Sequence, residues 1–193
     1  MEIAAATLYG LDILFLIAFQ FLNRDYGAVR HAISDFGIGK TAGLFRAYLL
    51  AGSIAAPLLA WQFWSATSPG YPATIPVWLL LVMVARLLLG LFPNDLRGAP
   101  RTRSGHVHHL ATLLGFTCAF MTTTEATPLL AASVEGTLGL VLVWLKHVIS
   151  IGFIAVVVTI SAPLRPYFGL AERVYLYATA LWFLTASLTL PPL

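Results

Sequence analysis

The chain has 193 residues, of which 59% are apolar and only 10% are charged, with a net charge of +3. Soluble domains usually carry about 25% charged residues, so this composition excludes an ordinary soluble fold and predicts that much of the surface faces lipid. The single cysteine, Cys118, excludes an internal disulfide and a cysteine-rich metal motif. Because the basic residues are divided among several loops, we expect membrane lipids as partners and no nucleic acid.

Six segments are apolar enough, and long enough, to cross a bilayer as helices, which takes about 20 residues each. They cover roughly residues 5–22, 44–66, 75–93, 107–133, 137–162 and 171–190. The third is expected to end at Pro93, Asn94 and Asp95, and Ser104 is expected to cap the fourth. No repeat or linker divides the chain, so the sequence predicts an all-α, polytopic membrane bundle that forms a single domain over residues 1–193.

The charged loops predict how this bundle is oriented. Nine of the eleven Lys and Arg residues lie in or beside the first, third and fifth loops: Arg24, Arg30, Lys40, Arg46, Arg97, Arg101, Arg103, Arg165 and Arg173. The positive-inside rule places these loops in the cytoplasm, which predicts a multi-pass plasma-membrane protein with both termini outside. An aromatic belt at the outer interface would be formed by Trp61, Trp64, Tyr71 and Trp78.

The first loop has the pattern of a short helix. Its apolar positions, spaced as one helical stripe, are Val29, Ala32, Ile33 and Phe36. Its polar positions, which would share another face, are His31, Ser34 and Asp35. We expect an interfacial helix whose apolar side lies in lipid or against the bundle, and whose polar side faces the third loop.

Polar residues of loops one and three are expected on the same side of the membrane. Five of them could converge: His31, Asp35, Asp95, His106 and His109. Imidazoles and carboxylates together can bind zinc or another divalent ion. Simpler interpretations are that these residues hydrogen-bond the loops and cap helix ends, or that they bind an anion or a lipid headgroup. His108 lies on another side of the helix and is expected to be solvated.

Five ionisable residues fall inside the predicted spanning segments, where charge is costly and usually faces the bundle interior. They are Asp12, Arg86, Glu125, Lys146 and His147. At about 1.5 Å per residue, all five lie in one layer about 10 to 17 Å below the outer boundary. This layer is either an ion-pair network that fixes helix order or part of a proton or ion path.

Several short motifs, taken together, resemble a known family. They are His31-Ala-Ile-Ser34-Asp35-Phe-Gly37, Arg86-x3-Gly90-x-Phe92-Pro93-x-Asp95, Gly105-His106-x2-His109 and Gly169-x2-Glu172-Arg173. Their order and their placement resemble the prokaryotic membrane family called domain of unknown function 998, over nearly the whole chain. The resemblance implies six helices and no established activity. It also singles out Ser34, Asp35, Arg86, Pro93, Asp95, His109, Glu172 and Arg173.

Three functions are compatible with these patterns. The favoured one is non-enzymatic binding or transport of a lipid or small solute through a cytoplasm-facing polar vestibule. Its binding residues would be Ser34, Asp35, Arg86, Asn94, Asp95, His106, His109 and Arg173. The second is a metal-dependent membrane hydrolase that uses a divalent metal. It has a loose analogy in the seven-helix alkaline ceramidases, but the last helix here lacks a His pair at i, i+4. The third is a structural subunit of a larger membrane complex or oligomer.

Overall fold

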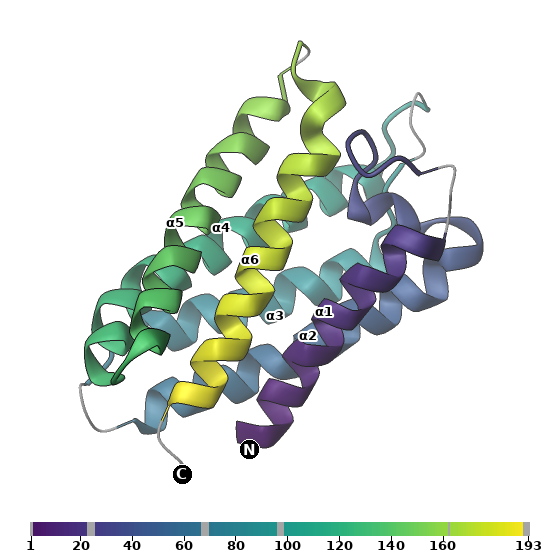
Figure 1. The fold of residues 1–193 in the computed structure, drawn as a ribbon. Coiled ribbons are helices and arrows are strands. Elements are labelled where there is room, and N and C mark those ends of the chain that lie inside the picture. Colours follow the sequence, from purple (N-terminus) through teal and green to yellow (C-terminus); the bar gives the residue numbers. More distant parts are fainter. Residues whose placement is uncertain (1, 23–25, 67–69, 96–98, 162, 191–193) are drawn as a thin grey trace.

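The computed structural model describes residues 2–22, 26–66, 70–95, 99–161 and 163–190, and this part of the chain contains six long α-helices and no strand (Figure 1). The helices are α1 (Glu2–Leu22), α2 (Ala42–Ser65), α3 (Thr74–Leu91), α4 (Arg103–Ser133), α5 (Thr137–Thr159) and α6 (Phe168–Thr189). No bound differs from the predicted one by more than four residues. The predicted six-helix, all-α architecture is confirmed.

The six helices form a closed ring in which each packs against its neighbours in sequence and α1 packs against α6. Helices α4 and α6 also contact each other. Helix α5 therefore packs on the outside of this pair and does not reach the centre of the bundle. The N-terminal end of α1 and the C-terminal end of α6 lie together at one end of the bundle (Figure 1). The first, third and fifth loops lie at the opposite end, which we call the basic end.

The outside of the bundle is apolar, as a lipid-facing surface requires. On α5 the exposed large side chains include Leu140, Trp144, Ile151, Ile154 and Val158. Among the described residues, four segments are long and apolar enough to cross a membrane: Ile3–Leu22, Gly39–Ser65, Thr74–Leu91 and Thr137–Thr159. Helices α4 and α6 are more polar, and they are the two that contact each other beside the ring's centre. These features define a membrane-type helical bundle.

Small residues allow α2 to approach its neighbours closely. The buried face of this helix carries Ala51, Gly52, Ala55, Ala56 and Ala60. Helices in membranes associate largely through van der Waals packing, and small side chains let their backbones come near. Close approach at α2 brings side chains of α1 and α3 together across its surface, and this is where the site described below is formed.

Loop one packs onto the bundle through two short 3₁₀ turns, η1 (Ile33–Gly37) and η2 (Gly39–Thr41). Ala32, Ile33 and Phe36 of the predicted apolar stripe are buried, whereas Val29 is exposed. The ring centroids of Phe36 and Phe19 are 4.9 Å apart. The apolar side of this segment therefore faces the bundle, which was one of the two predicted alternatives.

The start of α4 differs from the prediction, because Thr102 rather than Ser104 is the N-cap. The Thr102 hydroxyl accepts a 3.1 Å hydrogen bond from the Gly105 N–H, while the Ser104 hydroxyl donates to the Pro93 carbonyl at 2.9 Å. Asp95 holds Thr102 in this position by accepting from its N–H and from its hydroxyl. The cap was misassigned because this anchor lies in the preceding loop.

Candidate functional site

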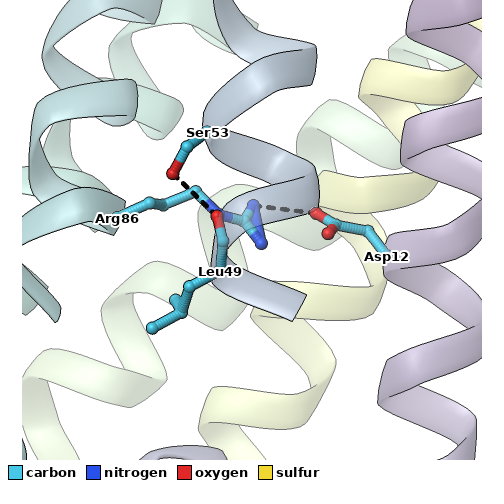
Figure 2. Close-up of polar contacts among 4 residues, drawn as sticks. All are labelled: Asp12, Leu49, Ser53 and Arg86. Carbon is cyan, nitrogen blue, oxygen red and sulfur yellow. Dashed lines mark hydrogen bonds and ion pairs between the residues drawn. The ribbon is translucent and has the colours of Figure 1, made fainter. Parts of the chain in front are cut away.

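A buried ion pair links α3 to α1 across the surface of α2 (Figure 2). The Nη1 of Arg86 donates to Oδ2 of Asp12 at 2.8 Å. The Arg86 side chain is 13% exposed and that of Asp12 is 3% exposed. Charges this far from water are costly unless they are paired and fully hydrogen-bonded. The pair confirms that these two residues face the bundle interior.

Helix α2 shapes the slot that holds the guanidinium. A Cβ at Gly52 would overlap with the guanidinium carbon and two of its nitrogens, so the group lies directly against the glycine backbone. One turn earlier, the Tyr48 ring centroid is 4.6 Å from Cζ of Arg86. Ser53 follows Gly52 in the chain, and its hydroxyl donates to the Leu49 carbonyl at 2.7 Å (Figure 2). Helix α2 thus supplies contact surface and no carboxylate.

The pair is only partly hydrogen-bonded. Within the described part of the chain, Arg86 Nε and Nη2, Asp12 Oδ1 and the Tyr9 hydroxyl are buried without a hydrogen-bond partner. Buried polar groups nearly always have a partner, and leaving one unsatisfied costs about 1–3 kcal/mol. The ion pair and the neighbouring Tyr9 hydroxyl thus contain four buried polar atoms for which the described chain supplies no partner.

Asp12 and Arg86 line a cavity of about 80 Å³ in the middle of the ring. Its wall comes from α1, α2, α3, α4, α6 and η1, whereas α5 does not contribute. The charged and strongly polar residues in the wall include Asp12, Ser34, Tyr48, Arg86, His108 and Glu172. Much of the remaining wall is apolar, with Leu49, Val82 and Leu176 among its members. A mostly apolar cavity with a few polar groups is the usual form of a small-molecule site.

His108 belongs to this wall, and the expectation that it is solvated was wrong. The residue is 1% exposed, and its Nδ1 lies 2.8 Å from the Phe92 carbonyl. A carbonyl only accepts, so Nδ1 donates, and the neutral ring presents Nε2 as an acceptor. Nε2 is buried without a partner among the described residues. Helix α4 begins earlier than predicted, which places its first turns against the end of α3.

At the basic end, α6 anchors loop one through two adjacent charged residues. The Nη1 of Arg173 donates to the carbonyls of Ala28 and His31 at 2.8 and 2.6 Å, and its Nε donates to Gln20 Oε1 at 3.0 Å. Oε2 of Glu172 accepts from the Ile33 N–H at 2.6 Å. The resemblance had marked both residues. Their observed contacts hold η1 over the cavity, and binding by Arg173 stays a prediction.

Loops one and three do meet, through residues predicted to bind. Asn94 Nδ2 donates to the Ser34 hydroxyl at 3.4 Å, and Ser34 also lines the cavity. Asp35 accepts from the Ala32 N–H, within its own turn. Hydrogen bonds from Thr102 lower the pKa of Asp95. Asp95 thereby links the third loop to the N-cap of α4. Both carboxylates thus accept hydrogen bonds from residues close to them in sequence.

The metal candidates are not brought together. No three His, Cys, Asp or Glu residues of the described chain lie close enough to hold a metal ion. His31 stacks on Tyr26 with ring centroids 5.1 Å apart, and His106 Nδ1 lies 2.8 Å from the Thr102 carbonyl. Metal binding by His31, Asp35, Asp95, His106 and His109 stays a prediction without support from these positions.

The five charges predicted in one layer do not form one network either. Only Asp12 and Arg86 pair, whereas Glu125 accepts from the Thr74 hydroxyl at 2.6 Å and from Trp78 Nε1 at 3.1 Å. On α5, Lys146 is half-buried and His147 is exposed. Counting depth along a helix gives no information on its rotation, and α5 turned out to lie outside the cavity.

The fold and the site define a six-helix membrane-type bundle with a guanidinium–carboxylate pair in the wall of a central cavity. The chain belongs to the family described as Protein of unknown function (DUF998), whose family model matches residues 4–189. The match covers nearly the whole chain and confirms the resemblance that the motifs indicated. No curated protein and no solved structure matches the chain.

Proposed function

We propose that this protein binds or transports a small solute or a lipid, with the central cavity as its binding site. One observation carries the proposal: the Arg86–Asp12 pair lies in the wall of a mostly apolar cavity with several of its buried polar atoms unpartnered. Apolar residues at these two positions would often be as stable as a buried ion pair, or more so. A half-bonded pair is therefore better explained by a ligand than by stability.

We further propose that the basic end of the bundle faces the cytoplasm. The concentration of basic residues in loops one, three and five supports a cytoplasmic location for the basic end, in the plasma membrane. Ser34 of η1 and His108 of α4 line the cavity on that side. The ligand would approach from the cytoplasm, past loop one, and would reach Arg86 at the inner end.

A cavity-filling variant tests this function without changing any charge. Ala180 of α6 is buried in the cavity wall, and Ala180→Leu places extra side-chain volume there. The matched control is Ala47→Leu, because Ala47 is exposed on the outside of α2. Detergent-purified proteins would be mixed in turn with sodium butyrate, glycerol and dioleoylphosphatidylglycerol, and the apparent melting temperature would be recorded.

We expect at least one of these probes to raise the melting temperature of the wild type and of Ala47→Leu, but not that of Ala180→Leu. A ligand at one hundred times its Kd stabilises the folded state by about 2.7 kcal/mol, which is easily measured. The proposal is wrong if no probe shifts the wild type, or if every shift is equally large in Ala180→Leu.

A further inference from the structure

The unpartnered atoms of Arg86 are the two nitrogens of a single edge of the guanidinium. Nη1 is engaged by Asp12, whereas Nε and Nη2 have no partner among the described residues. The N–H groups on Nε and Nη2 point in the same direction and are spaced to match the two oxygens of a carboxylate. An entire bidentate donor edge is therefore buried beside the cavity.

No residue of the described chain supplies a hydrogen-bond acceptor for Nε or Nη2. Gly52 and Tyr48 contact the guanidinium from α2 and hold its position. The hydroxyl of Ser53, which follows Gly52, donates to the Leu49 carbonyl of its own helix (Figure 2). Asp12 binds through one oxygen at the other end of the group. The edge is left for a group that comes from outside the chain.

We propose that the Nε–Nη2 edge of Arg86 binds the carboxylate of a small, mostly apolar acid, which enters together with one proton. This inference rests on the proposed function and names the ligand class of the same cavity. The cavity's small volume and the apolar wall at Val82, Leu89 and Leu176 suit a short hydrocarbon chain. A phosphate dianion fits less well, because it would bring two charges into the same surroundings.

The proton follows from charge balance. Asp12 already neutralises Arg86, so a bound carboxylate would leave one uncompensated negative charge in a poorly solvated space. One proton, carried by the ligand carboxylate or by Asp12, removes that charge. The other titratable groups around the pair are Tyr9 on α1, Tyr48 on α2, His108 on α4, and Glu172 and Tyr175 on α6. Butyrate affinity should then fall as pH rises, by up to about tenfold per pH unit.

The test compares butyrate with butyramide, its neutral isostere, on the detergent-purified full chain by isothermal titration calorimetry. We expect butyrate to bind the wild type at pH 5.5, to bind more weakly at pH 7.5, and to bind at least tenfold more tightly than butyramide. Arg86→Lys keeps the charge but lacks the bidentate edge, so it should weaken butyrate binding at least tenfold. The comparison of butyrate with butyramide uses the wild type alone, so it tests the proposal even if Arg86→Lys does not fold.

The outcomes separate this inference from the proposed function. Equal binding of butyrate and butyramide, or no butyrate binding at all, would overturn the carboxylate assignment. A glycerol or lipid shift that Ala180→Leu abolishes would in that case leave the cavity function standing. Undiminished butyrate affinity in folded Arg86→Lys would also contradict the inference, and a Kd equal at the two pH values would contradict the accompanying proton.

Discussion

Gly52→Ala should destabilise the protein by displacing Arg86, although alanine is the better helix former. The new methyl group would overlap with the guanidinium, so the Arg86 side chain must shift, and we expect this shift to separate it from Asp12. Breaking a buried ion pair costs about 3–5 kcal/mol because one charge is left uncompensated. Replacing a helical glycine by alanine returns up to about 1 kcal/mol. We therefore expect a net loss of about 2 to 4 kcal/mol.

The matched control lies in the same helix. A Cβ at Gly43 would meet no atom within 4 Å, so Gly43→Ala should leave stability unchanged or raise it slightly. Unfolding by sodium dodecyl sulfate in mixed micelles, followed by tryptophan fluorescence, would give both free energies. The loss of stability caused by Gly52→Ala should also disappear when this substitution is added to the Asp12→Leu/Arg86→Met variant. If Gly52→Ala is as stable as Gly43→Ala in the wild-type background, the packing of Arg86 against α2 is wrong.

Three further predictions concern the ion pair and the loops. Asp12→Asn should lower the free energy of unfolding by about 3–5 kcal/mol, and Asp12→Leu/Arg86→Met should recover most of that stability. The double variant should not recover butyrate binding. A double variant no more stable than Asp12→Asn would contradict this prediction. Gly169→Ala would overlap with the His31 carbonyl, so deuterium exchange at loop one should accelerate, whereas Gly90→Ala meets only an ordinary contact and should not change it. Thr102→Val should raise the pKa of Asp95 in a carboxyl NMR titration, because the hydroxyl that lowers it is lost. Since the pKa of Asp95 is lowered in the folded wild type, its contribution to stability is present above the unfolded pKa and is lost as pH falls through the folded pKa. This acid-dependent loss should shrink in Thr102→Val, and an unchanged titration would refute the assignment.

Hydropathy was sufficient to predict the helices, because a spanning segment must satisfy its backbone internally and cover itself with apolar side chains. The same reasoning identified Asp12 and Arg86, since a charge in such a segment is expensive enough to require a partner. Their pairing could not be derived in this way. It depends on Gly52, whose missing side chain makes room for the guanidinium between α1 and α3.

Three errors in placing polar residues have a common cause. The sequence gives the depth of a residue in the membrane, but it gives neither the rotation of its helix nor the helices that lie beside it. Lys146 and His147 were grouped with Arg86 by depth, yet they lie on α5, which does not line the cavity. His108 was assigned to solvent, yet it packs against the end of α3. Glu125 found neutral donors on α3 rather than a cation. Each outcome was decided by how a helix packs against its neighbours, which the spacing of residues within one helix does not give.

If Arg86 presents its Nε–Nη2 edge to a ligand in the cavity, the Nε–H group must respond when that ligand binds. Nitrogen-15 labelling of arginine allows the Nε–H resonance of Arg86 to be followed directly, with Arg86→Lys providing the assignment. We predict that butyrate shifts this resonance in the wild type, that butyramide does not, and that Ala180→Leu abolishes the shift. An Arg86 resonance that stays unchanged at saturating butyrate would contradict the account.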